Sequence, residues 1–232
     1  MTLVLSFEST AELTKNAAIE VAQQLHKAIA EKGEATLVIT GGSLGVQILG
    51  DLAELNLDLN KIKIWVGDER FVPMDHSDRN ELQAIEAWPA LANSALNRFP
   101  ATGMPLDAAA ESMSQEFFDQ FGAVDGAGDV FDVLLLGMGP DGHVASLFPG
   151  RDHEIAWVVA EHSSPKPPPQ RLSLSYQALN RSSHVIFLAS GAAKSDAVKC
   201  VLQQVGCGLP AAKVKGSAST TWYLDTEISR EL

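Results

Sequence analysis

The segment Asp132–Gly150 constrains the fold of this chain more than any other stretch. It opens with a short continuous apolar run, Val133–Leu136, that leads directly into a turn with glycines at positions 137, 139 and 142. An apolar run bounded by turn residues indicates a strand buried on both faces of a parallel sheet. Open α/β folds bind ligands at the carboxyl edge of such a sheet. The turn carries Asp141 and His143, so a titratable pair is expected at a ligand-binding edge.

Strand-like and helix-like segments alternate along the rest of the chain. Apolar runs predict strands at Leu3–Phe7, Ala35–Thr40, Lys61–Val66, Trp157–Glu161, Arg171–Ser175, His184–Ala189 and Thr220–Leu224. Helical spacing predicts helices from Ser9 to Gly33 and over Val46–Leu55, Asn80–Leu96, Ala108–Phe121 and about Ser190–Val205. This alternation predicts an α/β fold with a mostly parallel sheet and helices on both faces. The length of 232 residues and an apolar content of 46% favour a single domain over residues 1–232.

The charge of the chain restricts its partners. The formal net charge is −12, so a nucleic acid backbone or an anionic membrane surface would be repelled. The N-terminal apolar run Leu3–Phe7 has no basic residues before it, and no apolar stretch approaches membrane-spanning length. We therefore expect a cytoplasmic protein that captures any small anion with a local cluster of cations.

Cys200 and Cys207 are the two cysteines of the chain. They fall in a predicted helix and in the loop after it, without zinc-like spacing and without a secretory context. We expect both to be reduced thiols.

The loop Gly41–Gly45 matches the G-x-S-x-G nucleophile elbow between a strand and a helix, which would make Ser43 a nucleophile. Against this, Asp141 and His143 lie on one loop, whereas α/β-hydrolases carry their acid and histidine on separate loops. The N–H groups of glycines at a helix N-terminus, together with a serine hydroxyl, also form a phosphate cradle. We favour the cradle over the nucleophile, and a purely structural turn is the third reading.

The turn at residues 137–142 spells G-x-G-x-x-G after a strand, and Glu161 stands where a ribose-binding acid would be expected. On spacing alone this pattern suggests a dinucleotide. The strand is far from the first in the chain, however, and Pro149–Gly150 would end any helix within a turn or two. In addition, the Asp141 carboxylate would repel a pyrophosphate. We therefore reject the dinucleotide interpretation.

Asp141 and His143 suit acid–base chemistry instead. At the start of a short helix, the helix dipole would keep the imidazole neutral, the form that a general base needs. A nearby carboxylate can hold the tautomer and stabilise the charge once the proton is taken. The alternative is that Asp141 caps a helix and His143 is a loop histidine without a catalytic role.

Three cations are candidates for binding an anion. Arg70 ends a buried strand and could make a bidentate contact with a phosphate, or a surface salt bridge with its neighbours. Lys194 falls in the first turn of a predicted helix, where the dipole disfavours a cation unless an anion is bound. Arg171 follows the stiff segment Pro167–Pro169, which would fix its direction; a solvated arginine is the default reading.

Taken together, several blocks resemble the signature motifs of the 6-phosphogluconolactonase family. They are Thr40–Ser43, Trp65–Pro73, Leu135–Pro149, Arg171–Leu174 and Ser190–Lys194, with Trp222–Asp225 closing the series in the same order. The resemblance covers nearly the whole chain. It implies a three-layer α/β/α fold, Rossmann-like and similar to that of glucosamine-6-phosphate deaminases. The implied activity is the hydrolysis of 6-phospho-D-glucono-1,5-lactone to 6-phosphogluconate in the oxidative pentose phosphate pathway, without a metal or organic cofactor.

The resemblance also implies roles for individual residues. His143 would be the catalytic base acting on water, with Asp141 and Asp68 arranging the site. The residues that would hold the sugar phosphate are Gly41, Gly42, Ser43, Arg70, Arg171 and Lys194. A monomer is expected, with a weak dimer as the alternative.

Two other functions remain open at this point. An amino-sugar-phosphate deaminase of the same fold would need an acidic residue shortly after the histidine, where this chain has Ser146–Phe148 and no carboxylate before Asp152. A non-catalytic sugar-phosphate sensor would keep the cations without needing His143, but no output module is visible. The lactonase is favoured.

Overall fold

The computed structural model describes residues 1–151 and 153–232. The strands are β1 (Thr2–Phe7), β2 (Ala35–Ile39), β3 (Ile62–Val66), β4 (Asp68–Arg70), β5 (Ala95–Asn97), β6 (Phe131–Gly137), β7 (Val158–Glu161), β8 (Arg171–Leu174), β9 (Ser182–Ala189) and β10 (Ser219–Asp225). The α-helices are α1 (Thr10–Lys32), α2 (Gly42–Ala53), α3 (Asn80–Ala87), α4 (Leu106–Phe121), α5 (Tyr176–Leu179), α6 (Ser195–Gln203) and α7 (Thr226–Ser229).

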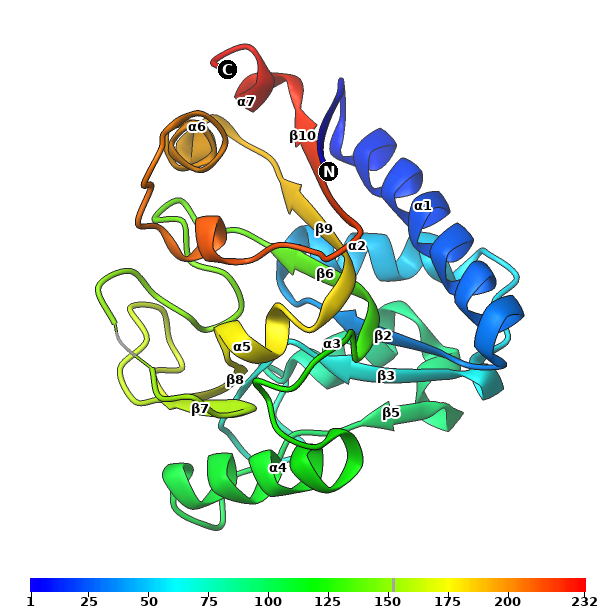
Figure 1. Ribbon diagram of the computed structural model, residues 1–232, viewed down its shortest axis with the longest axis vertical. Helices are drawn as coiled ribbons and strands as arrows, with labels where there is room; N and C mark the ends of the chain where they lie inside the picture. The colour runs from blue at the N-terminus through cyan, green and yellow to red at the C-terminus, as the bar shows by residue number, and fades with distance from the viewer. Residues whose placement is uncertain (152) are drawn as a thin grey trace.

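A seven-stranded sheet forms the centre of the molecule, in the order β1-β10-β9-β6-β2-β3-β5. Every neighbouring pair in it is parallel. In Figure 1 the strands descend from β10 near the chain termini to β5 beside α4. The predicted parallel α/β fold is thus confirmed. The central strand β6 is buried from Phe131 to Leu136, as its apolar sequence indicated.

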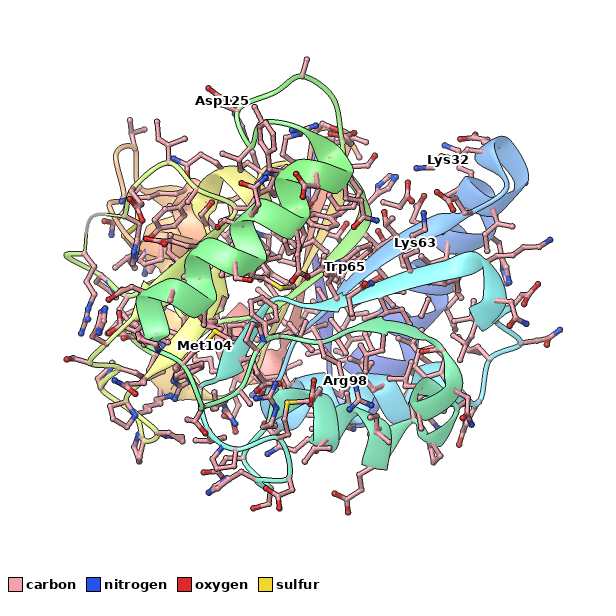
Figure 2. All side chains as sticks on the ribbon, turned by 90° about the horizontal axis from the view of Figure 1, so that it is seen from below. Lys32, Lys63, Trp65, Arg98, Met104 and Asp125 are labelled. Atoms are coloured by element: carbon pink, nitrogen blue, oxygen red, sulfur yellow. A yellow bond between two sulfur atoms is a disulfide. The ribbon has the colours of Figure 1, made fainter. Side chains whose placement is uncertain are left out.

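Helices cover both faces of this sheet. On one side α1 packs on α2, and α2 on α3, whereas α4 and α6 lie on the opposite side (Figure 1). Trp65 of β3 lies beneath α4 in Figure 2, where its ring contacts Phe117 and Phe121 of that helix. Burial of such large aromatic surfaces is a main source of core stability.

A separate three-stranded antiparallel sheet, in the order β4-β8-β7, stands beside the main one. The sequence predicted β7 and β8, but it placed Arg70 at the end of the strand Lys61–Val66 and did not predict β4 as a strand of its own. The helix expected over Asn80–Leu96 was wrong in extent, because α3 ends at Ala87. Pro89 disfavours helical backbone at Trp88 before it, and a 3₁₀ turn and the short strand β5 follow.

The expectation of two reduced thiols was also wrong, because Cys200 and Cys207 form a disulfide. The chain turns back after α6, where the Gln204 amide donates to the Cys200 carbonyl (3.0 Å) and the Cys207 amide to the Gln204 carbonyl (3.3 Å). This turn brings the two Cα atoms to 5.7 Å, within the range that a disulfide requires. The turn could not be read from the spacing of the cysteines alone.

Candidate functional site

The strand order places a crevice between β2 and β6. The next main-sheet strand after β2 is β3 on one side, whereas the next after β6 is β9 on the other side. Ligands of open α/β folds bind where the strand order reverses in this way. The two loops that leave β2 and β6 are joined by a hydrogen bond from the Gly137 amide to Thr40 Oγ1 (3.2 Å). A cleft of about 340 Å³ opens over them.

Nearly all of the residues predicted from the sequence line this cleft. They are Gly41, Gly42, Ser43, Asp68, Arg70, His143, Arg171 and Lys194. Asp141 does not line it, but its carboxylate contacts the His143 ring from behind. Residues from loops far apart in the sequence therefore meet at one cleft.

The His143 imidazole and the Asp141 carboxylate form a close pair. Nδ1 of His143 lies 2.5 Å from Oδ1 of Asp141, and the ring packs on Phe148 with centroids 4.7 Å apart. Partial burial alone would raise the pKa of Asp141, but the hydrogen bond and the charge of His143 outweigh it and lower that pKa below its ordinary value. An ionised Asp141 accepts a hydrogen bond from Nδ1–H of His143, which leaves Nε2 as the basic nitrogen.

The turn Gly137–His143, called the His143 turn below, is shaped by its glycines. The Gly139 amide donates to the His143 carbonyl (3.0 Å), and the Gly142 amide donates to the Gly139 carbonyl (3.0 Å). A Cβ on Gly139 would lie 2.1 Å from Nδ1 of His143. The glycine at position 139 therefore makes room for the imidazole and does not indicate a dinucleotide.

The short helix expected after His143 is absent. Residues 143–148 form turns and one isolated bridge between Val144 and Leu147. Ala145 adopts a left-handed backbone conformation (φ 48°), which interrupts helical geometry. The helix-dipole argument for a neutral imidazole was therefore wrong, and the tautomer is set by Asp141 instead.

Ser43 lies in the first turn of α2, whose N-cap is Gly41. Its side chain is exposed, and in the described part of the chain no histidine is hydrogen-bonded to its hydroxyl. A nucleophilic serine needs such a base, so this geometry disfavours the nucleophile elbow. The first N–H groups of α2 are instead available to an anion in the cleft.

Asp68 and Arg171 face each other across the two strands of the second sheet. Oδ2 of Asp68 lies 3.8 Å from Nη1 of Arg171, and their side chains are 9% and 8% exposed. The same Oδ2 accepts a hydrogen bond from Ser146 Oγ (2.6 Å), a residue that follows the His143 turn. Ser146 therefore joins the segment that follows the His143 turn to the charged side of the cleft.

The direction of Arg171 is fixed by the proline-rich segment, as the sequence indicated. Its Nε donates to the Pro168 carbonyl (3.2 Å), and its Nη2 donates to the carbonyls of Lys166 (3.0 Å) and Pro167 (3.4 Å). Arg70 is held by a hydrogen bond from Nη1 to the Asp78 carbonyl (2.6 Å), and its buried Nε has no hydrogen-bond partner in the described chain. Both guanidinium groups are thus pre-positioned.

Lys194 and Lys166 approach each other at the same cleft. Lys194 is the N-cap residue of α6 and not part of its first turn, where the sequence placed it, and Lys166 also lines the cleft. Burial lowers the pKa of Lys194, and the positive charge of Lys166 lowers it further, against the opposing effect of Asp225. Among the described residues neither lysine forms a salt bridge. Two ammonium groups at one cleft, neither in a salt bridge with a described carboxylate, would attract an anionic ligand.

Sequence reasoning missed three residues of this region: Glu69, Asn80 and Lys166. The fully buried Glu69 carboxylate accepts hydrogen bonds from the amides of Arg70 (2.7 Å), Asn80 (2.7 Å) and Glu81 (3.0 Å). Burial raises its pKa to about 7, although these bonds and Arg79 act in the opposite direction. Glu69 thereby holds the start of α3, whose own N-cap, Arg79, makes no capping bond.

Asn80 connects α3 to the cleft. Its Nδ2 donates to the Asp68 carbonyl (2.7 Å), and a Cβ on Gly41 would lie 2.1 Å from its Oδ1. Arg79, which precedes Asn80, has no exposed surface and donates to the Phe99 carbonyl (2.7 Å). Of the three missed residues, only Glu69 could have been found from the sequence. Side chains alternate between the two faces of a strand, so Glu69 is expected on the face opposite Asp68 and Arg70.

The fold and the cleft define an α/β protein with an acid–base pair and a cation cluster at the switch point of a parallel sheet. Its sequence matches the family described as glucosamine-6-phosphate isomerases/6-phosphogluconolactonase over residues 8–222. The chain belongs to this family.

Individual relatives agree with this assignment. The 6-phosphogluconolactonase of Mycobacterium leprae (strain TN) is 35% identical over 239 residues, which cover 97% of this chain and 96% of the relative. The crystal structure of 6-phosphogluconolactonase from Thermotoga maritima has a TM-score of 0.81 at 27% identity, covering 97% of this chain and 100% of that one. A monomeric glucosamine-6-phosphate deaminase shares the fold, with a TM-score of 0.78 at 21% identity over 99% and 100% of the two chains.

Within residues 1–151 and 153–232, no helix combines the length and the apolar character needed to cross a bilayer. The same residues contain no group of three or more His, Cys, Asp or Glu side chains that could hold a metal ion.

Proposed function

We propose that this chain hydrolyses 6-phospho-D-glucono-1,5-lactone to 6-phospho-D-gluconate, the second step of the oxidative pentose phosphate pathway. The observation that carries the proposal is the pair of His143 and Asp141, 2.5 Å apart, at a cleft that also holds the two lysines without counterions. Membership of a family that includes lactonases narrows the substrate to a sugar phosphate.

In the proposed mechanism, His143 acts as the base that activates water. Nε2 takes one proton from the water as its oxygen attacks the C1 carbonyl of the lactone, and Asp141 stabilises the resulting imidazolium. The tetrahedral intermediate then collapses with cleavage of the bond between C1 and the ring oxygen. The imidazolium returns the proton to that oxygen, which becomes the 5-hydroxyl of the product.

We assign the substrate's two ends to different groups. Lys166, Lys194 and the N–H groups of Gly42 and Ser43 hold the 6-phosphate, with Gly41 allowing its close approach. Arg70, Arg171 and Asp68 contact the ring end, where cationic donors also stabilise the developing oxyanion. A lactone is an activated ester, so one base and such donors suffice without a covalent nucleophile or an added cofactor.

The proposal also includes the oligomeric state, the kind of substrate and the cellular compartment. We expect a functional monomer, with a weak dimer as the alternative. The net charge of −12 supports a small anionic substrate rather than a nucleic acid. We place the reaction in the cytoplasm.

The proposal is tested with lactone generated enzymatically immediately before use, because the lactone also hydrolyses spontaneously. We expect the protein to accelerate its disappearance far above a blank without enzyme, and to act poorly on unphosphorylated glucono-1,5-lactone. Equal rates on both lactones would contradict the phosphate assignment. Release of ammonia from glucosamine 6-phosphate, with no effect on the lactone, would establish the deaminase instead.

A further inference from the structure

The disulfide between Cys200 and Cys207 closes a segment whose two ends both lead to the cleft. At its N-terminal end, α6 begins directly after Lys194, which lines the cleft. At its C-terminal end, Cys207 is followed by Gly208 and Leu209. The cysteines therefore join the helix that positions one of the cations to a second loop.

That second loop supports the His143 turn from outside. A Cβ on Gly142 would lie 2.8 Å from Cδ1 of Leu209, so the leucine side chain packs directly on this glycine. The Ala211 amide also donates to the Gly142 carbonyl (3.0 Å). Gly142 precedes His143 in the chain. A change in the position of Leu209 is thus transmitted to the imidazole through one residue.

We propose that Cys200 and Cys207 are a thiol–disulfide modification site whose redox state adjusts the His143 turn. Reduction by a dithiol transfers two electrons and two protons through a mixed disulfide on one of the cysteine sulfurs. It leaves two thiols in this chain and a disulfide in the reagent. Oxidation by a small disulfide such as oxidised glutathione runs the same exchange in reverse, with release of two reduced glutathione molecules.

The surroundings of the cysteines favour reversible exchange. Both residues are only partly buried, so a thiolate can reach them without unfolding of the core. The cysteines are seven positions apart, and a disulfide that closes so short a loop constrains the unfolded chain less than one that closes a long loop. The effect of reduction is therefore local. It releases the turn at residues 204–207, from which Leu209 reaches Gly142.

The effect on turnover rests on the proposed hydrolysis, but the chemistry of the cysteines does not. We expect alkylation followed by mass spectrometry of the native protein to find two free thiols after dithiothreitol and none after oxidised glutathione. The oxidised protein should have a kcat/KM about three- to tenfold above the reduced one, since small displacements of a catalytic group have effects of at least this size.

Three variants separate the parts of the proposal. The double variant Cys200→Ser/Cys207→Ser should show the activity of the reduced protein in both buffers. Leu209→Ala should keep the exchange of the cysteines but lose the redox dependence of kcat/KM. Val205→Ala, in the same loop but with a fully exposed side chain, is the matched control and should behave like the wild type.

Two results would overturn the proposal. Cysteines that stay in one state in both buffers would rule out a modification site. Cysteines that interconvert with no change in kcat/KM would rule out coupling to the cleft. If the lactone is not the substrate, amide hydrogen exchange at residues 139–143 measures, without any turnover, whether the redox state of the cysteines changes the His143 turn. Exchange rates equal in the two redox states would then contradict it.

Discussion

The two walls of the cleft hold their functional groups by different means. On one wall, His143 and Asp141 are fixed by hydrogen bonds within a glycine-rich turn, and their side chains are 15% and 39% exposed. On the other side, called the charged wall, Asp68 and Arg171 line the cleft and Glu69 lies on the opposite face of β4, and all three are buried. Buried charges need paired or hydrogen-bonded surroundings, which ties this wall to the stability of the fold. Substitutions on the His143 wall should therefore affect turnover alone, and those on the charged wall should also affect folding.

The largest effect is expected for His143→Ala. Loss of the base should lower kcat about 10²- to 10⁴-fold, with KM nearly unchanged. Because the imidazole lies at the edge of the cleft and makes one side-chain hydrogen bond, to Asp141, besides its contact with the Phe148 ring, the melting temperature should change little. His162→Ala is the matched control, since the Nε2 of this exposed histidine is likewise bonded to a carboxylate, Asp107 (2.9 Å). Unchanged kcat in His143→Ala would refute the mechanism.

The charged wall is tested by the pH dependence of unfolding in Glu69→Gln. Burial raises the pKa of Glu69 from 4.5 to about 7, so the folded state favours the protonated form. The stability that this group contributes is fully present below pH 4.5 and is lost as the pH rises through about 7. Between these two pH values the free energy of unfolding of the wild type should fall by on the order of 3 kcal/mol relative to the variant, whose glutamine at position 69 cannot titrate.

Urea unfolding at several pH values measures this difference. Glu34→Gln is the control, because Glu34 is exposed and pairs with Lys63 on the surface. The free energy of unfolding of this variant should depend on pH as it does in the wild type. If the free energy of unfolding changed with pH equally in the wild type and in Glu69→Gln, the pH dependence would not come from Glu69.

A third prediction concerns the two lysines between the walls. Lys194→Ala and Lys166→Ala should each raise KM for the phosphorylated lactone about 10- to 100-fold. This is the loss of affinity expected when one charge-assisted hydrogen bond is removed. Their effect on kcat should be smaller, and turnover of the unphosphorylated lactone should hardly change. Lys199→Ala, on the exposed side of α6, is the control. A uniform loss on both lactones would contradict a phosphate site.

The smallest effect is expected for Ser146→Ala, which removes the link between the walls. Its hydroxyl donates to Asp68 (2.6 Å), and the loss should lower kcat/KM about three- to tenfold. Ser217→Ala removes a comparable bond to Asp129 (2.6 Å) on the exposed surface and should have no effect. An equal response of the two variants would mean that the walls act independently.

Most of the fold could be predicted because its signals are local. Continuous apolar runs marked the buried strands β2, β6 and β9, and parallel topology placed their polar loops on one edge. The same logic brought Ser43, His143 and Lys194 together. What the sequence could not show depends on contacts across the chain. Glu69 is identifiable as an anchor of α3 only when β4 is known to be a strand.

Two errors have the same origin. The helix expected at His143 fails because Ala145 takes a left-handed conformation, which no propensity scale assigns to alanine. The two cysteines were read as thiols because their pairing depends on the turn after α6. In both cases the conformation depends on contacts with other parts of the chain, which rules based on neighbouring residues do not take into account. The residue roles assigned to Arg70, Arg171 and Lys194 remain predictions that only kinetics can test.

The pairing of β1 has a consequence for synthesis of the chain. This strand lies at the edge of the sheet, and its neighbour is β10, with Leu3 opposite Thr221. Because β1 precedes β10 in the chain by more than 200 residues, it leaves the ribosome well before the strand with which it pairs. During that interval the backbone N–H and C=O groups of β1 are unpaired and available to other chains. A nascent or truncated chain that stops before Ser219 should consequently be the form most prone to aggregate.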